Sequence, residues 1–490
     1  MSTYSRIDKV STAGRPQRQA VFSSPRQTLK ALLIHAAPDD MEYPFRSHPL
    51  GGMYLTAYAE REVPGVSVDI IDLKVADHGI AGLGGIVRDM KPDVVGIGAL
   101  TVHAASLHAA AAAVRGEAPE ALLLAGGPHA TCFPEKVLAD DNIDAVVLGG
   151  GERAFKENRE ARTEGRQTEN IHAVGTPAHL DTDERNTIDN PDDIPFPAWE
   201  KIDMPAYERH SSFTILGRRK YMSLFSSRAC PYACIYCHNI FGRNYRPRSA
   251  ENVLAEMRLL SERYGICDFD VLDDAFNLKR DRVETICNAI IDEKLDVRMA
   301  FPNGLRSDLL DEKLVKLMRR AGATYISFAI ETASPRLQKV IHKNLKIEKA
   351  EKALRAASRE GILCNGYFML GFPTETEEEL RSTIDFALHA PLDIAHFLRV
   401  TPFEGTSLYE MLDESTKQTL QQHPEYLCYE DRHLNLSKVP TKRFKFLFKY
   451  ALVRFYINPF RILGILRHHP DWKSMLQYVP IALKRIFVKG

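Results

Sequence analysis

Continuous apolar runs alternate with longer segments of helical character in two separate stretches of this 490-residue chain. The first stretch has such runs at 29–36, 67–73, 94–100, 121–127 and 145–151. Because few polar residues interrupt these aliphatic and β-branched runs, we expect strands buried on both faces, as in a parallel sheet covered by helices. Residues 29–160 are therefore predicted to form an α/β domain of the flavodoxin or Rossmann type, with a five-stranded parallel sheet.

The second stretch follows a polar, proline-bearing segment, 161–220, whose clearest linker signal is "DNPDDIPFPAW". Its apolar runs lie at 222–227, 269–274, 297–304, 325–332, 365–372 and 394–403. Six β/α units amount to three quarters of a (β/α)8 barrel, so residues 221–410 are predicted to form a partial (β/α)6 barrel of the TIM type. Both folds place ligands beyond the carboxyl ends of their strands.

The two ends of the chain differ in composition from these domains. Residues 1–28 are polar and basic, lack the apolar core of a signal peptide, and are expected to form a flexible tail. Residues 411–490 are expected to be a small helical region, and its last part, 441–490, carries eleven Lys or Arg among aromatic residues with one acidic residue, Asp471. No apolar run approaches the roughly 20 residues of a membrane span, so we expect a cytoplasmic protein whose thiols stay reduced.

Three of the eight cysteines, Cys230, Cys234 and Cys237, fall within the stretch "SSRACPYACIYCHN". Clustered thiols in a reducing compartment indicate metal or redox chemistry. Structural zinc requires four ligands, usually in two separated pairs, and the only nearby fourth donor is His238, whose side chain is adjacent to that of Cys237. Three thiolates suit a [4Fe-4S] cluster, because they leave one iron open for another ligand. A zinc knuckle, or three structural thiols, remains the alternative.

The pattern Cys230-x3-Cys234-x-Tyr236-Cys237, after the first strand of a partial barrel, resembles the cluster loop of the radical S-adenosylmethionine superfamily. The resemblance implies that the open iron binds the amino and carboxylate groups of S-adenosylmethionine. It further implies that an electron from the cluster cleaves this cofactor to a 5′-deoxyadenosyl radical, which removes hydrogen from an unactivated carbon. Tyr236, the aromatic residue before the last cysteine, is then expected to pack near the adenine.

Three later segments add to this resemblance. "VLDDAF" places Asp273 and Asp274 where the family has acceptors for the methionyl ammonium, and "FAIETAS" places Glu331 where a polar group holds the ribose. "FMLGFPTET" resembles the fifth-strand motif near the adenine, which assigns Gly371 to that site. Capping of a turn by Asp274 and an ion pair of Glu331 at the barrel end are the structural alternatives.

The first domain lacks G-x-G-x-x-G after its first strand and has no P-loop. Its segments "HPLGGMYLTAYAE", "ALTVHAASL", "GGPHATCFPEKVL" and "DAVVLGGGERAF" resemble the cobalamin-binding domain that precedes the barrel in cobalamin-dependent radical S-adenosylmethionine enzymes. The resemblance implies cofactor contacts from Thr101, Gly126, Gly127, His129, Gly149 and Gly150. The Asp-x-His-x2-Gly motif of the methionine synthase type is missing, so the lower cobalt ligand is undefined. We expect His129 to contact the corrin or the nucleotide tail rather than cobalt, and a domain that binds nothing is the alternative.

The resemblance implies a C-methyltransferase that uses a [4Fe-4S] cluster, S-adenosylmethionine and cobalamin. One S-adenosylmethionine would methylate cob(I)alamin, and a second would give the 5′-deoxyadenosyl radical, so that a substrate radical takes the methyl group from methylcobalamin. Ring chemistry without methyl transfer, as in the anaerobic cyclase of bacteriochlorophyll synthesis, is the alternative within the same architecture. A non-catalytic cobalamin or iron–sulfur sensor is the alternative of another class.

The expected partners are a small-molecule or lipid-like substrate and an electron donor such as flavodoxin or ferredoxin. The basic and aromatic segment 441–490 suits contact with the anionic inner face of a membrane. A helical cap on the barrel with a solvated basic face explains the same pattern and is the simpler expectation. Lys plus Arg equals Asp plus Glu at 64 each, so there is no global basic bias and no nucleic acid is expected.

Overall fold

The computed structural model describes residues 28–37, 45–152, 154, 171–173, 188–212, 214, 216, 220–238, 240–422 and 434–468. Most of the expected N-terminal tail, 1–27, lies outside these ranges, as does 469–490 of the C-terminal region. The chain divides into two compact units: Met1–Asp39, Gly51–Ile188 and Pro197–Ile202 belong to the first, and Asp40–Leu50, Asp189–Phe196 and Asp203–Gly490 to the second. The segment expected to be a linker therefore contributes to both units.

The first unit is built on a six-stranded sheet with the order β3-β1-β4-β5-β6-β7. Its strands are β1 (Leu29–His35), β3 (Val66–Asp72), β4 (Val94–Gly98), β5 (Leu122–Gly126), β6 (Ala145–Val147) and β7 (Ile171–Ala173). The first five are parallel, which confirms the predicted sheet, and the short β7 adds an antiparallel edge. The chain order reverses between β1 and β4, and this switch point is where such sheets bind ligands.

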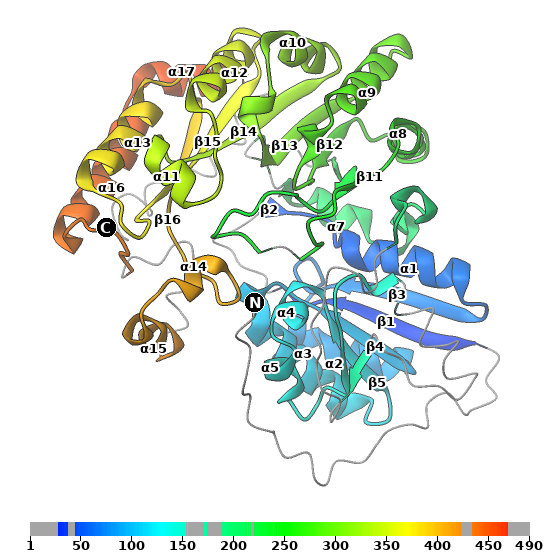
Figure 1. The fold of residues 1–490 in the computed structure, drawn as a ribbon. Helices are drawn as coiled ribbons and strands as arrows, with labels where there is room; N and C mark the ends of the chain where they lie inside the picture. The colour runs from blue at the N-terminus through cyan, green and yellow to red at the C-terminus, as the bar shows by residue number, and fades with distance from the viewer. Residues whose placement is uncertain are drawn as a thin grey trace. The chain divides into compact units, whose positions relative to one another are not determined.

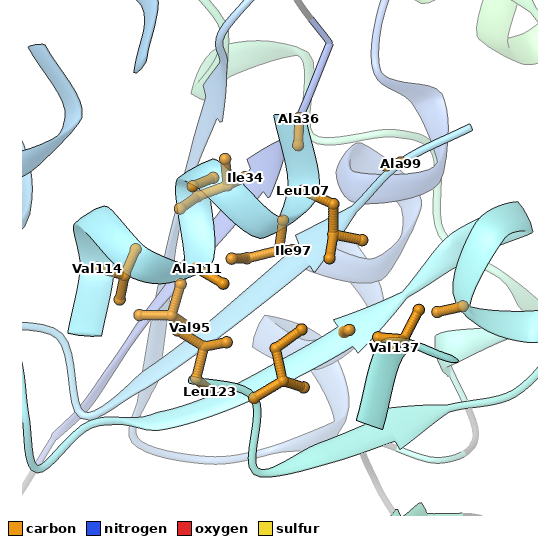
Figure 2. Close-up of a cluster of buried hydrophobic side chains, with 14 of the residues drawn as sticks. Ile34, Ala36, Val95, Ile97, Ala99, Leu107, Ala111, Val114, Leu123 and Val137 are labelled. Atoms are coloured by element: carbon orange, nitrogen blue, oxygen red, sulfur yellow. The ribbon is translucent and has the colours of Figure 1, made fainter. Parts of the chain in front are cut away.

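Helices cover both faces of this sheet, which explains why its inner strands β4, β5 and β6 are apolar, whereas β3 at the edge also carries Ser67 and Asp69. They are α1 (Leu50–Glu62), α2 (Gly79–Met90), α3 (Ala104–Glu117), α4 (Gly127–Cys132) and α5 (Pro134–Leu138). Ile34, Val95 and Ile97 point to one face, where Leu107 of α3 and Val137 of α5 pack on them (Figure 2). Residues of the opposite parity, such as Ala31 and Leu33, pack with α1 on the other face.

The second unit contains a parallel sheet whose strand order follows the chain order, as in a barrel opened along one side. Its strands are β9 (Met222–Leu224), β12 (Asp268–Val271), β13 (Arg298–Leu305), β14 (Ala323–Glu331), β15 (Leu363–Leu370) and β16 (Ile394–Arg399). The helices α8 (Ala250–Tyr264), α9 (Arg280–Asp292), α10 (Glu312–Arg320), α12 (Ile347–Arg359) and α13 (Glu377–His389) lie on its outer side (Figure 1). The predicted partial (β/α)6 barrel is confirmed.

Local sequence signals set the ends of these barrel helices. Ser249 caps α8 by accepting a hydrogen bond from the backbone N of Asn252, and Gly265 ends the helix in the left-handed conformation. At α13, Thr376 and Glu379 form a reciprocal capping box.

Smaller elements complete the second unit: β2 (Phe45–Arg46) with β8 (Ser211–Ser212), β10 (Ser227–Arg228) with β11 (Arg246–Pro247), α7 (Met204–Glu208), α11 (Pro335–Val340), α14 (Ser407–Glu410) and α15 (Glu414–Gln422). Near the C-terminus, α16 (Thr441–Tyr456) and α17 (Pro459–His468) lie beside α13 on the outside of the barrel (Figure 1). None of the helices in the described ranges is long and apolar enough to cross a membrane.

Candidate functional site

The loop with the three clustered cysteines leaves the barrel after β9, and the antiparallel pair β10 and β11 closes its base. Ala229, just before Cys230, has a φ of +71°, so the chain turns sharply as the loop begins. Ile235 anchors the middle of the loop, because its N donates to Ile341 O (3.1 Å) and its O accepts from Leu408 N (2.8 Å). Its side chain is buried in an apolar cluster with Phe372. The cysteines therefore sit on a loop whose backbone is held by the barrel.

The loop raises the pKa values of the Cys230 and Cys237 thiols. Loss of hydration, together with the neighbouring Cys234 and Asp274, raises the pKa of the Cys237 thiol to about 12. Burial also raises the pKa of Cys230. Because the thiolate is the form that binds metal, the positive charge of a metal centre is what would stabilise three thiolates in this loop.

No three His, Cys, Asp or Glu side chains within the described ranges are placed to hold one metal ion. The cysteines of a [4Fe-4S] cluster bind separate irons, so they need not converge on one point. The three-cysteine loop therefore fits a cluster better than it fits a zinc ion.

Tyr236 and Glu331, expected near the adenine and the ribose, lie against each other. Glu331, at the end of β14, has a φ of +64° and is buried. Its Oε1 accepts hydrogen bonds from Tyr236 OH (3.3 Å) and from Lys343 Nζ (3.0 Å). Lys343 Nζ also lies 3.4 Å from Tyr236 OH. The buried Lys343 was missed from the sequence, because it lies after α11 in a segment without any motif.

The two aspartates after β12 have different environments. The Asp273 carboxylate is buried and accepts three hydrogen bonds of 2.6 Å, from Ser226 N, Ser226 Oγ and Ser227 Oγ. These bonds tie Asp273 to the chain that leads into the cysteine loop. Asp274 is near Cys230 and Cys237, whose pKa values it raises, and burial together with Asp273 raises its own pKa to about 6. Asp273 is thus bonded to the serines, whereas Asp274 makes none of these bonds and is the better candidate to bind a cofactor.

The turn after β15 is shaped around Gly371, which has a φ of +101°. A Cβ atom there would lie 3.2 Å from the Phe444 ring, which is a tight contact. The positive φ therefore favours glycine, and the nearby ring leaves little room for a side chain. Glu375 Oε2 accepts from Gly371 N (2.6 Å) and Phe372 N (3.1 Å), and burial raises the pKa of Glu375 to about 8. The Phe372 ring centroid lies 6.0 Å from that of Tyr236, which brings this turn beside the expected adenine contact.

Arg306 is a second residue that the sequence analysis missed. Its guanidinium lies 3.9 Å from the ring centroid of Tyr232, which stands between Cys230 and Cys234. Its Nη2 also donates to Lys343 O (2.9 Å). Arg306 therefore connects the cysteine loop to the segment that carries Lys343.

In the first unit, the residues expected to contact cobalamin follow β4, β5 and β6. Thr101 begins the turn after β4, Gly126 ends β5, and Gly127 begins α4 with a φ of +77°. A Cβ atom on Gly127 would lie 3.5 Å from Ala99 N, which is an ordinary contact, so the positive φ rather than lack of space favours glycine here. Gly149, with a φ of +69°, donates from N to Thr131 Oγ1 (3.1 Å), and Gly150 follows it in the same turn.

His129 is buried at the start of α4, where its backbone N donates to Ala99 O (3.0 Å). Burial lowers its pKa to about 4, with smaller contributions from His108 and Lys136, so its ring is neutral at physiological pH. Its Nδ1 is buried without a hydrogen-bond partner in the described part of the chain. Leu100 and Val102 are exposed in the neighbouring turn. An unpartnered nitrogen, glycine turns and exposed apolar side chains at the carboxyl ends of β4, β5 and β6 fit a corrin cofactor.

Comparisons with known families match both units. The model of the radical SAM superfamily matches residues 224–387, and that of the B12-binding domain matches residues 41–158. An uncharacterized methyltransferase of Pyrococcus horikoshii is 31% identical over 428 residues, which cover 86% of this chain and 90% of the relative. The cytidylyl-2-hydroxyethylphosphonate methyltransferase of Streptomyces wedmorensis is 29% identical, with 78% and 81% covered.

The anaerobic magnesium-protoporphyrin IX monomethyl ester cyclase of Rubrivivax gelatinosus is 25% identical over 68% of this chain and 60% of its own length. Among solved structures, the radical S-adenosylmethionine methyltransferase TsrM from Kitasatospora setae, with cobalamin and a [4Fe-4S] cluster bound, superposes with a TM-score of 0.64. It is 19% identical, with 78% of this chain and 77% of that chain covered, so this likeness concerns the fold.

Proposed function

Because this chain belongs to the cobalamin-dependent radical S-adenosylmethionine enzymes, we propose that it is a C-methyltransferase that acts on an unactivated carbon. One observation carries the proposal: two relatives that align over more than three quarters of the chain are methyltransferases. When bound, the cluster supplies the electron that cleaves S-adenosylmethionine, and cobalamin carries the methyl group.

The residues of the second unit have distinct tasks in this proposal. Cys230, Cys234 and Cys237 hold the cluster. Tyr236 and Glu331, fixed by their contact with each other and with Lys343, orient the adenosyl part of S-adenosylmethionine. The Asp274 carboxylate accepts a hydrogen bond from the methionyl ammonium group. Asp273 fixes the start of the cysteine loop through its bonds to Ser226 and Ser227, and the turn at Gly371 borders the adenine. Preorganised contacts of this kind keep the reacting groups in one geometry without further ordering.

In the first unit, the turns with Gly126, Gly127, Gly149 and Gly150 allow close backbone approach to cobalamin. Thr101 contributes a hydroxyl in the turn after β4. His129, buried and neutral, contacts the corrin or its nucleotide tail through the imidazole.

The products formed from S-adenosylmethionine test the proposal. The protein is purified and reconstituted without oxygen, then incubated with S-adenosylmethionine, cobalamin and a reductant. Methyl transfer uses one cofactor molecule as methyl donor and a second as radical source, so S-adenosylhomocysteine and 5′-deoxyadenosine should both form. A substrate added to this assay should gain one methylene unit in mass.

The same assay separates the rival functions. Formation of 5′-deoxyadenosine without S-adenosylhomocysteine would favour the cyclase chemistry of the relative from Rubrivivax gelatinosus. A reduced cluster that never cleaves S-adenosylmethionine would favour a non-catalytic sensor.

The electrons require a donor, and we propose flavodoxin or ferredoxin, with a small-molecule or lipid-like substrate. Peripheral contact of the region 441–490 with the inner face of a membrane belongs to the same proposal. Only its part up to residue 468 lies within the described residues.

A further inference from the structure

Helix α17 turns a charged side chain toward the barrel and large apolar side chains toward solvent. Of its described side chains, Arg461 and Gly464 face the barrel. Arg461 Nη2 donates to Leu388 O (2.5 Å), and its guanidinium lies 3.7 Å from the ring centroid of Phe455. A Cβ atom on Gly464 would lie 3.2 Å from Asp393 Oδ1. Among the α17 residues whose side chains the structure describes, those turned to the barrel are therefore an arginine and a glycine rather than large apolar residues.

Exposed apolar side chains lie on α17 and at Ile457, the residue that ends α16. Phe460 is 81% exposed, Leu463 is 61% exposed, and Ile457 is 65% exposed. Phe460 and Leu463 are three residues apart and so lie on the same side of α17, while Ile457 lies in the turn between α16 and α17. The partly buried Arg461 bonds to backbone oxygens at the end of α13, and with α17 held in this way Phe460 and Leu463 remain exposed.

Helix α16 extends the same surface. Its inner side buries Phe444 and Phe455, while Phe446 and Tyr450 are exposed and stack on each other with ring centroids 6.4 Å apart. Seven of the twelve exposed large apolar residues in the described ranges fall within 446–466. Such a concentration indicates a contact surface, because isolated exposed apolar residues are scattered.

The charged residues of α16 and α17 themselves are all basic, and Arg443 is paired with Glu377 of the neighbouring α13. Lys442, Lys445, Lys449 and Arg454 are exposed on α16. The sequence from 434 to 468 contains no acidic residue. Two copies of this surface brought together would repel each other, whereas an anionic surface would be attracted.

We propose that this surface docks onto an anionic phospholipid bilayer, and we call it the docking face: Phe446, Tyr450, Ile457, Phe460 and Leu463, flanked by Lys442, Lys445 and Lys449. Its apolar side chains enter the boundary between headgroups and acyl chains, and its lysines lie among the phosphates. The inference stands apart from the chemistry at the cysteine loop and narrows the membrane contact to one face of two helices.

Flotation of the full-length protein with vesicles tests the docking face. Vesicles of phosphatidylglycerol and phosphatidylcholine should bind the protein at low salt, and vesicles of phosphatidylcholine alone should bind it at least about 10-fold more weakly. The double variant Phe460→Ser with Leu463→Ser removes two exposed apolar anchors and should weaken binding by about 10-fold or more. The double variant Lys445→Ala with Lys449→Ala should weaken it by about 5- to 30-fold and reduce its salt dependence.

Matched controls separate this face from the rest of the surface. Met411→Ser removes an exposed apolar residue elsewhere, and Lys349→Ala with Lys352→Ala removes two exposed lysines of α12. Both controls should bind vesicles as the unchanged protein does. All variants should still form 5′-deoxyadenosine without vesicles, so failure of docking and failure of the methyltransferase proposal are told apart.

Three outcomes would overturn the inference. The first is no flotation of the unchanged protein with anionic vesicles. The second is equal binding by the Phe460 and Leu463 variant. The third is a dimer in vesicle-free solution that this variant abolishes, since the face would then belong to a second copy of the chain.

Discussion

Lys343 lies 12 residues beyond Glu331 and contacts both Glu331 and Tyr236. Lys343→Met would leave the buried Glu331 carboxylate without its cation while keeping the volume of the side chain. A charge-assisted hydrogen bond in such a place contributes about 1.5 to 3 kcal/mol. We therefore expect S-adenosylmethionine to bind about 10- to 100-fold more weakly, measured by its perturbation of the electron paramagnetic resonance spectrum of the reduced cluster.

Two further variants define this positioning role. Lys343→Arg should restore part of the affinity, and Lys339→Met, at an exposed lysine of α11, should leave it unchanged. Affinity retained in Lys343→Met would show that Lys343 has no part in positioning Glu331.

Asp273 and Asp274 should separate loop support from cofactor binding. Asp273→Asn weakens the three bonds from Ser226 and Ser227, so iron bound per chain after reconstitution should fall. Asp274→Asn should keep its iron and lose affinity for S-adenosylmethionine. If instead Asp274→Asn loses iron and Asp273→Asn loses affinity for S-adenosylmethionine, then Asp274 supports the loop and Asp273 binds the cofactor.

His129 should make the first unit sensitive to acid. Its pKa is about 4 in the folded chain and about 6.5 when unfolded, so the unfolded chain binds the proton more readily. Its contribution to stability is full above about pH 6.5 and falls as the pH drops toward 4, by about 3 kcal/mol over that window. Calorimetry of the apoprotein should show this slope, His129→Phe should lose it, and His389→Gln, at an exposed histidine, should keep it.

Among the elements, the turn after β15 depends on a residue without a side chain. In Gly371→Ala the new side chain would sit at a φ that is unfavourable for alanine, and its Cβ would press against the Phe444 ring. We expect the free energy of unfolding of the second unit to fall by about 2 kcal/mol or more. Gly361→Ala has a positive φ but open space around it, so it should cost about 1 kcal/mol. If Gly371→Ala and Gly361→Ala lower the free energy of unfolding in denaturant by the same amount, the contact with Phe444 does not contribute to the cost.

The elements themselves were predictable from local pattern. Apolar runs mark both parallel sheets, because a strand covered on both faces must be apolar at every position whatever its neighbours are. The antiparallel β7 escaped prediction, since a three-residue edge strand leaves almost no periodic signal. Helix α17 lies in the region that was predicted to be helical, but the sequence pattern did not tell which of its sides faces outward.

For the whole molecule, the two units should hold their cofactors independently, because each has its own hydrophobic core. Cys230→Ala, Cys234→Ala and Cys237→Ala should each lose the cluster and the formation of 5′-deoxyadenosine while keeping bound corrinoid. Iron analysis and the corrinoid absorption spectrum measure the two cofactors. Cys267→Ala, at a cysteine outside the loop, should keep both, and loss of corrinoid from the loop variants would show that the cofactors depend on each other.

The spacing of three cysteines, the alternation of apolar runs and the glycines after β5 and β6 are local features. From them the sequence by itself determined both folds and the family, and it predicted which loop would hold the cluster. The tertiary structure decided the rest. Tyr236 contacts Glu331, 95 residues away, and Lys343, 107 residues away. The Asp273 carboxylate accepts hydrogen bonds from Ser226 and Ser227, and Arg461 bonds to α13 while Phe460 and Leu463 of α17 are exposed. Each of these depends on which side chains the fold brings together, and no local pattern carries that information.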